Sequence, residues 1–169
     1  HDVYGGPWDY QAPRQATQKK ADLRRAQIPV LPSQFVETTV LMPDAHTRAL
    51  TNFSFEERGY LREIYDIQTP RTLLMCGRQV EKSTTLGNKM LAYSCLIPHF
   101  KVLYVSPSST QTKEFSKTRL KESIETCPDL RTWFPSHLTD NVFEKKAINR
   151  SQLTLRYAFL NADRCRGLS

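Results

Sequence analysis

Lys82, Ser83 and Thr84 open a predicted helix directly after a polar turn that ends an apolar run, in the stretch TLLMCGRQVEKSTT over residues 72–85. This order of strand, turn and helix start is typical of phosphate-binding loops, because backbone N–H groups at a helix N-terminus carry partial positive charge. In such a loop Lys82 would contact the β- and γ-phosphates and Ser83 would bind Mg²⁺. The stretch therefore predicts a site for a nucleoside triphosphate.

The strict loop pattern G-x-x-x-x-G-K-[ST] is not met. It would place glycine at Cys76 and Glu81, and the chain has only Gly77, one position after the first of these. An alternative interpretation is an ordinary helix start of an α/β protein, with Ser83 or Thr84 as the N-cap.

The array C-x-R-Q-x-x-K-S resembles the deviant Walker A loop of large terminase subunits, the ATPases that pump DNA into tailed-phage capsids; its residues are Cys76, Arg78, Gln79, Lys82 and Ser83. The resemblance implies ATP and Mg²⁺ as cofactors. It implies that Arg78 senses the γ-phosphate, that Lys82 binds phosphate and that Ser83 ligates Mg²⁺. The residues expected to contact the nucleotide are Gly77, Gln79, Val80, Glu81, Lys82, Ser83 and Thr84.

Glu81 departs from the family's pattern, and Arg166 extends the resemblance beyond the loop. Glu81 stands where most members have glycine, so its carboxylate would repel phosphates unless it points outward or pairs with a cation such as Lys89 or Arg78. Arg166, in a stretch that looks like terminase sequence just ahead of the Walker B strand, matches an arginine that reaches the neighbouring subunit's nucleotide. Arg164 is the second choice, and a surface arginine in a loop is the alternative.

Apolar periodicity around the loop predicts an α/β fold that begins β-loop-α-β. A short buried strand is expected over residues 72–76, and a helix from Lys82 or Ser83 to Ile97, where Pro98 ends it. Gly87 suggests that this helix packs closely against the sheet. Residues 101–106, KVLYVS, predict a strand covered on both faces. The inner helix face is expected to hold Leu86, Met90, Tyr93 and Ile97.

A charged helix to about Thr126 follows, with Phe115, Leu120 and Ile124 facing inward, and then a hairpin of strands over residues 142–148 and 152–160. Three polar residues lie at the start of that helix: Ser108, Ser109 and Gln111. The resemblance suggests that they contact DNA, and the alternative is that they form a helix cap and turn.

Residues 52–66 predict a helix ahead of the loop strand, with Tyr60, Leu61, Ile64 and Tyr65 on one face. The resemblance places the adenine pocket here. For stacking on the base the candidates are Phe53, Phe55 and Tyr60; the alternative is that these rings pack the helix onto the sheet.

One domain with an arm before it is expected: the arm covers residues 1–34 and includes a short helix over 16–27, and residues 35–169 form the N-terminal part of a P-loop ATPase domain of the ASCE type. No apolar run ends in Asp-Glu, so Asp129, Asp140 and Asp163 receive no catalytic role. We expect the sheet to be incomplete because the chain ends before the Walker B strand, with the nuclease domain also absent. The piece alone should then be inactive.

The net charge of +7 suits contact with nucleic acid, although a solvated surface is the default explanation for basic clusters such as Lys145-Lys146. The four cysteines lack metal-ligand spacing; Cys76 and Cys95 are expected to be small core residues. No apolar run is long enough to span a membrane.

The partners implied by the resemblance are double-stranded DNA, other copies in a ring, the portal protein and the small terminase subunit. The implied location is the host cytoplasm and, transiently, the procapsid portal. Alternatives are a helicase-like DNA-dependent ATPase and a non-catalytic basic nucleic-acid-binding module with a relic P-loop.

Overall fold

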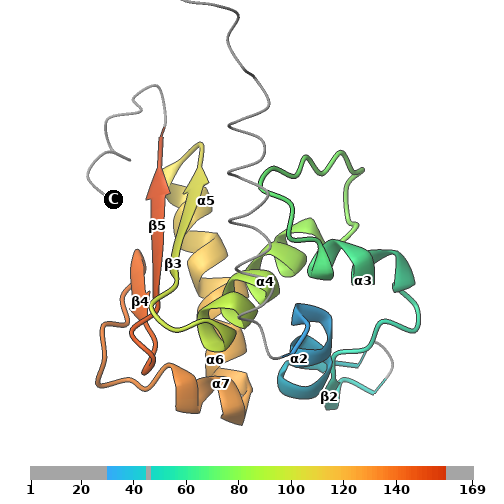
Figure 1. Ribbon diagram of the computed structural model, residues 1–169, viewed down its shortest axis with the longest axis horizontal. Helices are drawn as coiled ribbons and strands as arrows, with labels where there is room; N and C mark the ends of the chain where they lie inside the picture. The colour runs from blue at the N-terminus through green and yellow to red at the C-terminus, as the bar shows by residue number, and fades with distance from the viewer. Residues whose placement is uncertain (1–29, 45–46, 159–169) are drawn as a thin grey trace, which may run out of the picture.

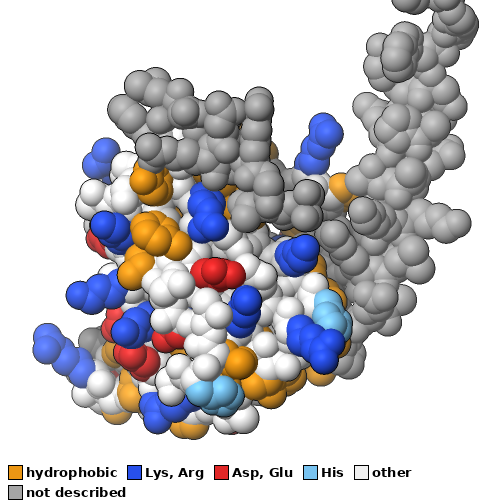
Figure 2. All heavy atoms as spheres, turned by 90° about the vertical axis from the view of Figure 1, so that its left-hand side faces the viewer, with side chains coloured by type: hydrophobic (Ala, Val, Ile, Leu, Met, Phe, Trp, Pro, Cys, Tyr) orange, Lys and Arg blue, Asp and Glu red, His pale blue; other side chains and the backbone are white. Residues whose placement is uncertain are grey.

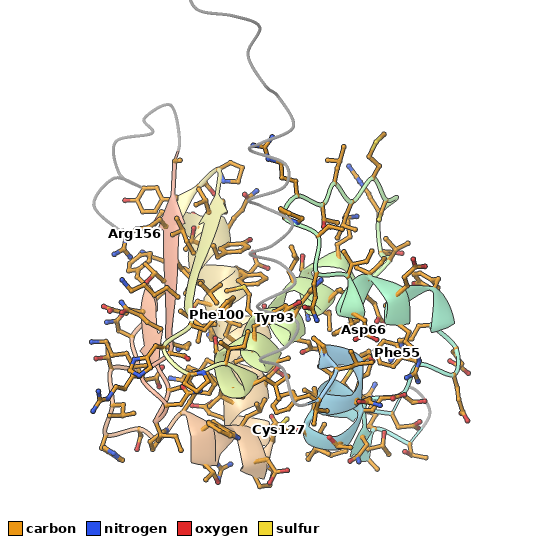
Figure 3. The ribbon with its side chains drawn as sticks, viewed as in Figure 1. Phe55, Asp66, Tyr93, Phe100, Cys127 and Arg156 are labelled. Atoms are coloured by element: carbon orange, nitrogen blue, oxygen red, sulfur yellow. The ribbon has the colours of Figure 1, made fainter. Side chains whose placement is uncertain are left out.

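A computed structural model describes residues 30–44 and 47–158 of the chain. Its N-terminal elements are helix α2 (Pro32–Thr39), a small antiparallel pair of strands β1 (Leu41–Pro43) and β2 (Leu50–Asn52), and helix α3 (Gly59–Asp66). Asp66 ties α3 to the start of α2, because its carboxylate accepts hydrogen bonds from the backbone N–H and the hydroxyl of Ser33 at 2.9 and 2.7 Å. Figure 3 shows Asp66 at this junction.

Helix α4 (Lys82–Leu96) lies between these elements and a three-stranded sheet (Figure 1). The sheet has the order β3-β5-β4, where β3 (Lys101–Ser106) runs parallel to β5 (Gln152–Tyr157) and β4 (Glu144–Lys146) runs antiparallel to it. A nearly continuous helical segment joins β3 to the hairpin region: α5 (Ser109–Phe115), the π-helix η1 (Ser116–Lys121) and α6 (Glu122–Thr126), followed by α7 (Pro128–Trp133).

The core fills the space between α4, the α5–α6 segment and one face of the sheet. Leu153 and Leu155 of β5 lie opposite Val102 and Tyr104 of β3 on this face, and the Tyr104 ring stacks on Phe115 with centroids 4.0 Å apart. Fully buried side chains of the helices complete it, among them Leu91, Leu120 and Leu130. Alternate residues of both strands point to the opposite face, where Thr154 of β5 is buried but Leu103 and Val105 of β3 are exposed.

Several predicted elements are confirmed. The helix after the loop and the strand over residues 101–106 have the expected bounds within a residue, and the charged helix reaches Thr126 with Phe115, Leu120 and Ile124 buried. The hairpin forms from β4 and β5. Cys95 is buried as expected. The helix predicted over residues 52–66 forms only over Gly59–Asp66, because Phe53 and Phe55 precede it as core residues of the connecting segment.

The expected strand over residues 72–76 is wrong. The segment is not part of a sheet, and the exposed fractions of Leu73 and Met75 are 83% and 87%. Cys76 is exposed too, and so is not a core residue. A strand needs a neighbour to pair its backbone groups, and none of the described strands lies beside this segment. The same open arrangement explains a second error: β3 is covered on one face only, and Leu103 and Val105 on the other face are each 44% exposed.

Two expectations about side chains also need correction. Leu86 of α4 is exposed, while Ile97 is buried beside an inner face that is largely small and polar, with Thr85, Gly87, Asn88 and Ala92. Lys145 is not a solvated surface residue: it is buried on the core face of β4 and pairs with Asp140. Among the described helices, none combines the length and apolar character that a membrane crossing requires.

Candidate functional site

The loop before α4 curls around the ammonium group of Lys82. Its Nζ donates to the carbonyl oxygens of Gly77 and Cys76, the latter at 3.5 Å. The N–H of Thr85 is the first to bond back along the helix, to the Glu81 carbonyl at 2.8 Å, so the N–H groups of the three preceding residues have no partner inside the helix. No acidic side chain stands in the first turn. A loop interior with a lysine and free N–H groups is suited to bind an anion.

Two residues of the loop have left-handed backbone conformations. Gln79 has a φ of 60° and Glu81, the N-cap of α4, a φ of 56°. Glycine adopts this conformation without cost, whereas other residues lose about 1–2 kcal/mol. The structure thus gives Glu81 the backbone geometry of the glycine that the usual loop pattern has at this position.

Of the two ways in which Glu81 could avoid repelling phosphates, the structure shows pairing with a cation, but the cation is Arg58, at the start of α3, and not Lys89 or Arg78. Arg58 Nη2 lies 3.3 Å from Glu81 Oε1, with the two side chains 26% and 29% exposed. Lys89 instead donates to the carbonyl oxygens of Ile64 and Ile67, both at 2.8 Å, and so caps the C-terminal end of α3. Burial lowers the pKa of Lys89 to about 8, and the nearby Asp66 carboxylate partly opposes this shift.

An apolar pocket of about 230 Å³ lies between α3 and the loop. Tyr60 lines it from α3, and Gly77, Val80 and Lys82 line it from the loop and α4. Of the three rings proposed for stacking on a base, only Tyr60 is available, with 59% of its surface exposed. The rings of Phe53 and Phe55 are buried against each other and against Tyr65, so their packing role is the correct one.

Ser83 faces a different, more polar pocket of about 340 Å³ on the other side of α4's first turn. This pocket is also lined by Gln111, Glu114 and Thr118 of the α5–η1 segment, and by Arg119. Hydroxyl and carboxylate oxygens are the donors that Mg²⁺ prefers. Ser83 and Glu114 are therefore the side chains of this pocket that could ligate a magnesium ion, while Arg119 adds a positive charge to the same lining.

Beneath the loop, Tyr65 and Asn88 join α3 to α4. Asn88 Nδ2 donates to the Tyr65 hydroxyl at 3.1 Å, inside the protein. Burial raises the pKa of the Tyr65 phenol to about 12, and the charge of Glu81 adds to the rise. This buried contact holds the two helices that carry Tyr60 and Lys82 in fixed relation.

The structure brings some of the predicted site residues together and separates others. Gly77, Val80 and Lys82 share the pocket beside α3, and Ser83 lines the pocket beside α5. Arg78 and Gln79 are exposed on the loop. Arg166 and Arg164 lie outside the described residues, as do the expected arm helix over 16–27 and Asp163. Ser108 is the N-cap of α5, since its hydroxyl accepts from the Gln111 N–H at 3.2 Å.

Two residues of the site were missed from the sequence. Arg58 and Glu114 belong to charged stretches that resemble any solvated helix surface, and nothing in their spacing marks them. Outside both pockets, Gln68, two residues after α3 ends, has both amide atoms buried without a hydrogen-bond partner among the described residues. A buried amide with no partner is unfavourable, but burial of a glutamine is not visible in a sequence.

The fold is that of a mixed α/β domain, and the start of α4 has a lysine and a first turn without acidic side chains. Residues 49–160, about two-thirds of the chain, match the family model described as phage terminase large subunit gpA, ATPase domain. The chain belongs to this family. A search of curated proteins gave no match.

Proposed function

We propose that the loop over residues 77–84 binds the phosphates of ATP, as part of the motor that packages double-stranded DNA into phage capsids. Family membership supports the use of ATP. The observation that carries the proposal for this loop is the position of Lys82: its ammonium group lies within the loop, at the start of a helix whose first N–H groups are free. An ATP phosphate would replace the carbonyl oxygens that now accept from Lys82.

The remaining parts of the nucleotide have places on either side of the loop. The base would enter the apolar pocket beside α3, where Tyr60 presents an exposed ring. Ser83, with Glu114 across the second pocket, would hold Mg²⁺, whose charge neutralises the phosphate oxygens when it is bound. Arg78, exposed on the loop, would sense the γ-phosphate. In this proposal the loop acts as the P-loop of an ASCE-type ATPase.

The wider role comes from the family. We propose that the domain over residues 35–169 works in a ring of copies, in which Arg166 reaches the nucleotide of the next subunit. It acts on double-stranded DNA in the host cytoplasm, together with the portal protein and the small terminase subunit. Lys and Arg side chains spread over the face at the β4 edge of the sheet, where acidic side chains are fewer (Figure 2), which suits a DNA partner.

ATP affinity of the Lys82→Ala variant tests the phosphate site. Losing a charged hydrogen bond should weaken binding about 10- to 100-fold, because such a bond contributes about 1.5–3 kcal/mol. Lys101→Ala, which removes an exposed lysine at the start of β3, is the matched control and should bind like the wild type. Equal affinity of Lys82→Ala and wild type, with unchanged circular dichroism, would remove the phosphate site from this loop. Absence of ATP binding to the wild type would favour a relic loop.

A further inference from the structure

Glu81 places a negative charge at the residue from which the backbone enters α4. One carboxylate oxygen pairs with Arg58, and the other, Oε2, is buried without a hydrogen-bond partner among the described residues. A half-paired carboxylate next to an anion site costs affinity if it turns toward the anion. The direction in which Glu81 is held therefore matters for any phosphate in the loop.

The carboxylate is held on the α3 side of α4. It lies close enough to the Tyr65 hydroxyl to raise the pKa of Tyr65, and Tyr65 is part of the contact between α3 and α4. Ser83, two residues later, faces the α5 side. The pairing of Glu81 with Arg58 and the place of Ser83 in the pocket beside α5 thus put these two side chains on different sides of the helix start.

Arg58 is itself fixed in place. Its guanidinium carbon lies 5.2 Å from the centroid of the Phe53 ring, a buried residue, and its backbone N–H donates to the Phe55 carbonyl at 3.1 Å. A planar guanidinium stacked on a buried ring has little freedom to follow a moving partner. Arg58 is thus a rigid support for Glu81 and not a mobile counter-charge.

We propose that Arg58 is a positioning residue of the nucleotide site, which holds the Glu81 carboxylate against α3 and away from the phosphates. This rests on the proposed function of the loop. Such a support explains how a glutamate can occupy the left-handed position that the usual loop pattern gives to glycine. It also assigns the charged start of α3 a role in nucleotide affinity, although Arg58 does not itself touch the nucleotide.

A double-mutant cycle tests the role of Arg58. ATP affinity is measured by titration calorimetry for the wild type, Arg58→Gln, Glu81→Gln and the double variant, near physiological ionic strength, where charges farther apart than about 8 Å are largely screened. Arg58→Gln should weaken binding about tenfold, because the freed carboxylate can turn toward the phosphates. In the Glu81→Gln background the same substitution should change affinity less than about threefold, because no carboxylate remains to be released.

Arg62→Ala is the matched control. Arg62 lies one turn along α3, pairs with Glu37 at 2.7 Å and covers the Phe55 ring at 4.8 Å, so it has the same kind of contacts without touching the loop. It should bind ATP like the wild type. If Arg58→Gln proves unstable by circular dichroism, the same cycle with Arg58→Lys decides, since lysine keeps the charge but not the planar fork.

The outcomes separate the role of Arg58 from the function of the loop. Equal weakening by Arg58→Gln in the wild type and in the Glu81→Gln variant would mean that Arg58 acts on the nucleotide directly or by long-range charge, and would overturn the positioning role. Unchanged affinity of Arg58→Gln would overturn it as well. If the wild type and Glu81→Gln both fail to bind ATP, the function proposed for the loop fails, and the role of Arg58 fails with it.

Discussion

Gly87 marks the closest approach between α4 and the π-helix η1, and replacing it should destabilise the fold. A Cβ added at Gly87 would lie 3.2 Å from Arg119 Cβ and 3.4 Å from the Arg119 carbonyl oxygen. Favourable carbon contacts lie at about 3.5–4.0 Å, so the new atom would be too close to Arg119 Cβ, while its contact with the carbonyl oxygen would leave no room to move away. These neighbours are backbone and the first side-chain atom, so they can move only if the helix moves. The close packing expected of Gly87 is therefore confirmed, but against η1 and not against the sheet.

Two opposing effects set the magnitude for Gly87→Ala. Alanine gains about 1 kcal/mol over glycine inside a helix. Crowding of a packed contact costs about 1–3 kcal/mol. We expect a net loss of about 1 kcal/mol, which lowers Tm by about 2–4 °C for a chain of this size. Gly87→Val adds two methyl groups at the same place and a poorer helix former, and should lose at least about 2 kcal/mol.

Urea unfolding followed by circular dichroism measures these changes. Gly59→Ala is the matched control, because a Cβ at Gly59 would meet nothing within 4 Å at the first residue of α3. It should leave stability unchanged or raise it by up to about 1 kcal/mol. A Gly87→Ala variant as stable as Gly59→Ala, with Gly87→Val also unharmed, would show that η1 does not crowd α4.

Two further predictions concern buried groups. The pKa of Lys89 is about 8 in the folded protein, whereas its ordinary value is 10.5. Between these two pH values the unfolded chain binds more protons than the folded protein. The contribution of Lys89 to the free energy of unfolding should therefore rise from pH 8 to 10.5. The difference in stability between wild type and Lys89→Met should follow this rise, and a flat or falling difference would contradict it. Leu120→Ala, at a fully buried side chain, should cost about 2–5 kcal/mol in urea unfolding, far more than Leu86→Ala on the exposed side of α4.

The elements whose signals are local could be predicted from the sequence. Pro98 and the lysine-serine start mark both ends of α4, and alternation of Leu153 and Leu155 marks β5 as half-buried. The loop could be located for the same reason, since its chemistry depends on neighbouring residues. Lys82 lines the pocket beside α3 and Ser83 the pocket beside α5, while their roles toward a nucleotide stay a prediction.

Features that depend on distant contacts could not be predicted. The residues around Leu73 have the composition of a strand, but a strand also requires a partner, which composition does not supply. Apolar periodicity predicted an inner face of α4 made of large apolar residues. The buried face instead contains small residues such as Gly87, because α4 is closely packed against its neighbours. Glu81 pairs with Arg58 and not with Lys89 because of how α3 is oriented against α4. The spacing of residues within either segment does not reveal that orientation.

The π-helix η1 also determines how this segment of the chain can change in length. Phe115 and Leu120 are five residues apart and would lie about 140° apart around an α-helix, yet both are buried because the wider turn brings them into line. A π-turn holds one residue more than the α-helical turn it replaces. Deleting a single residue between Ser116 and Leu120 would restore α-helical spacing and keep α5 and α6 on their present faces. The same deletion within α4 would rotate everything after it. Related chains should therefore be able to lack one residue at η1, but none in α4.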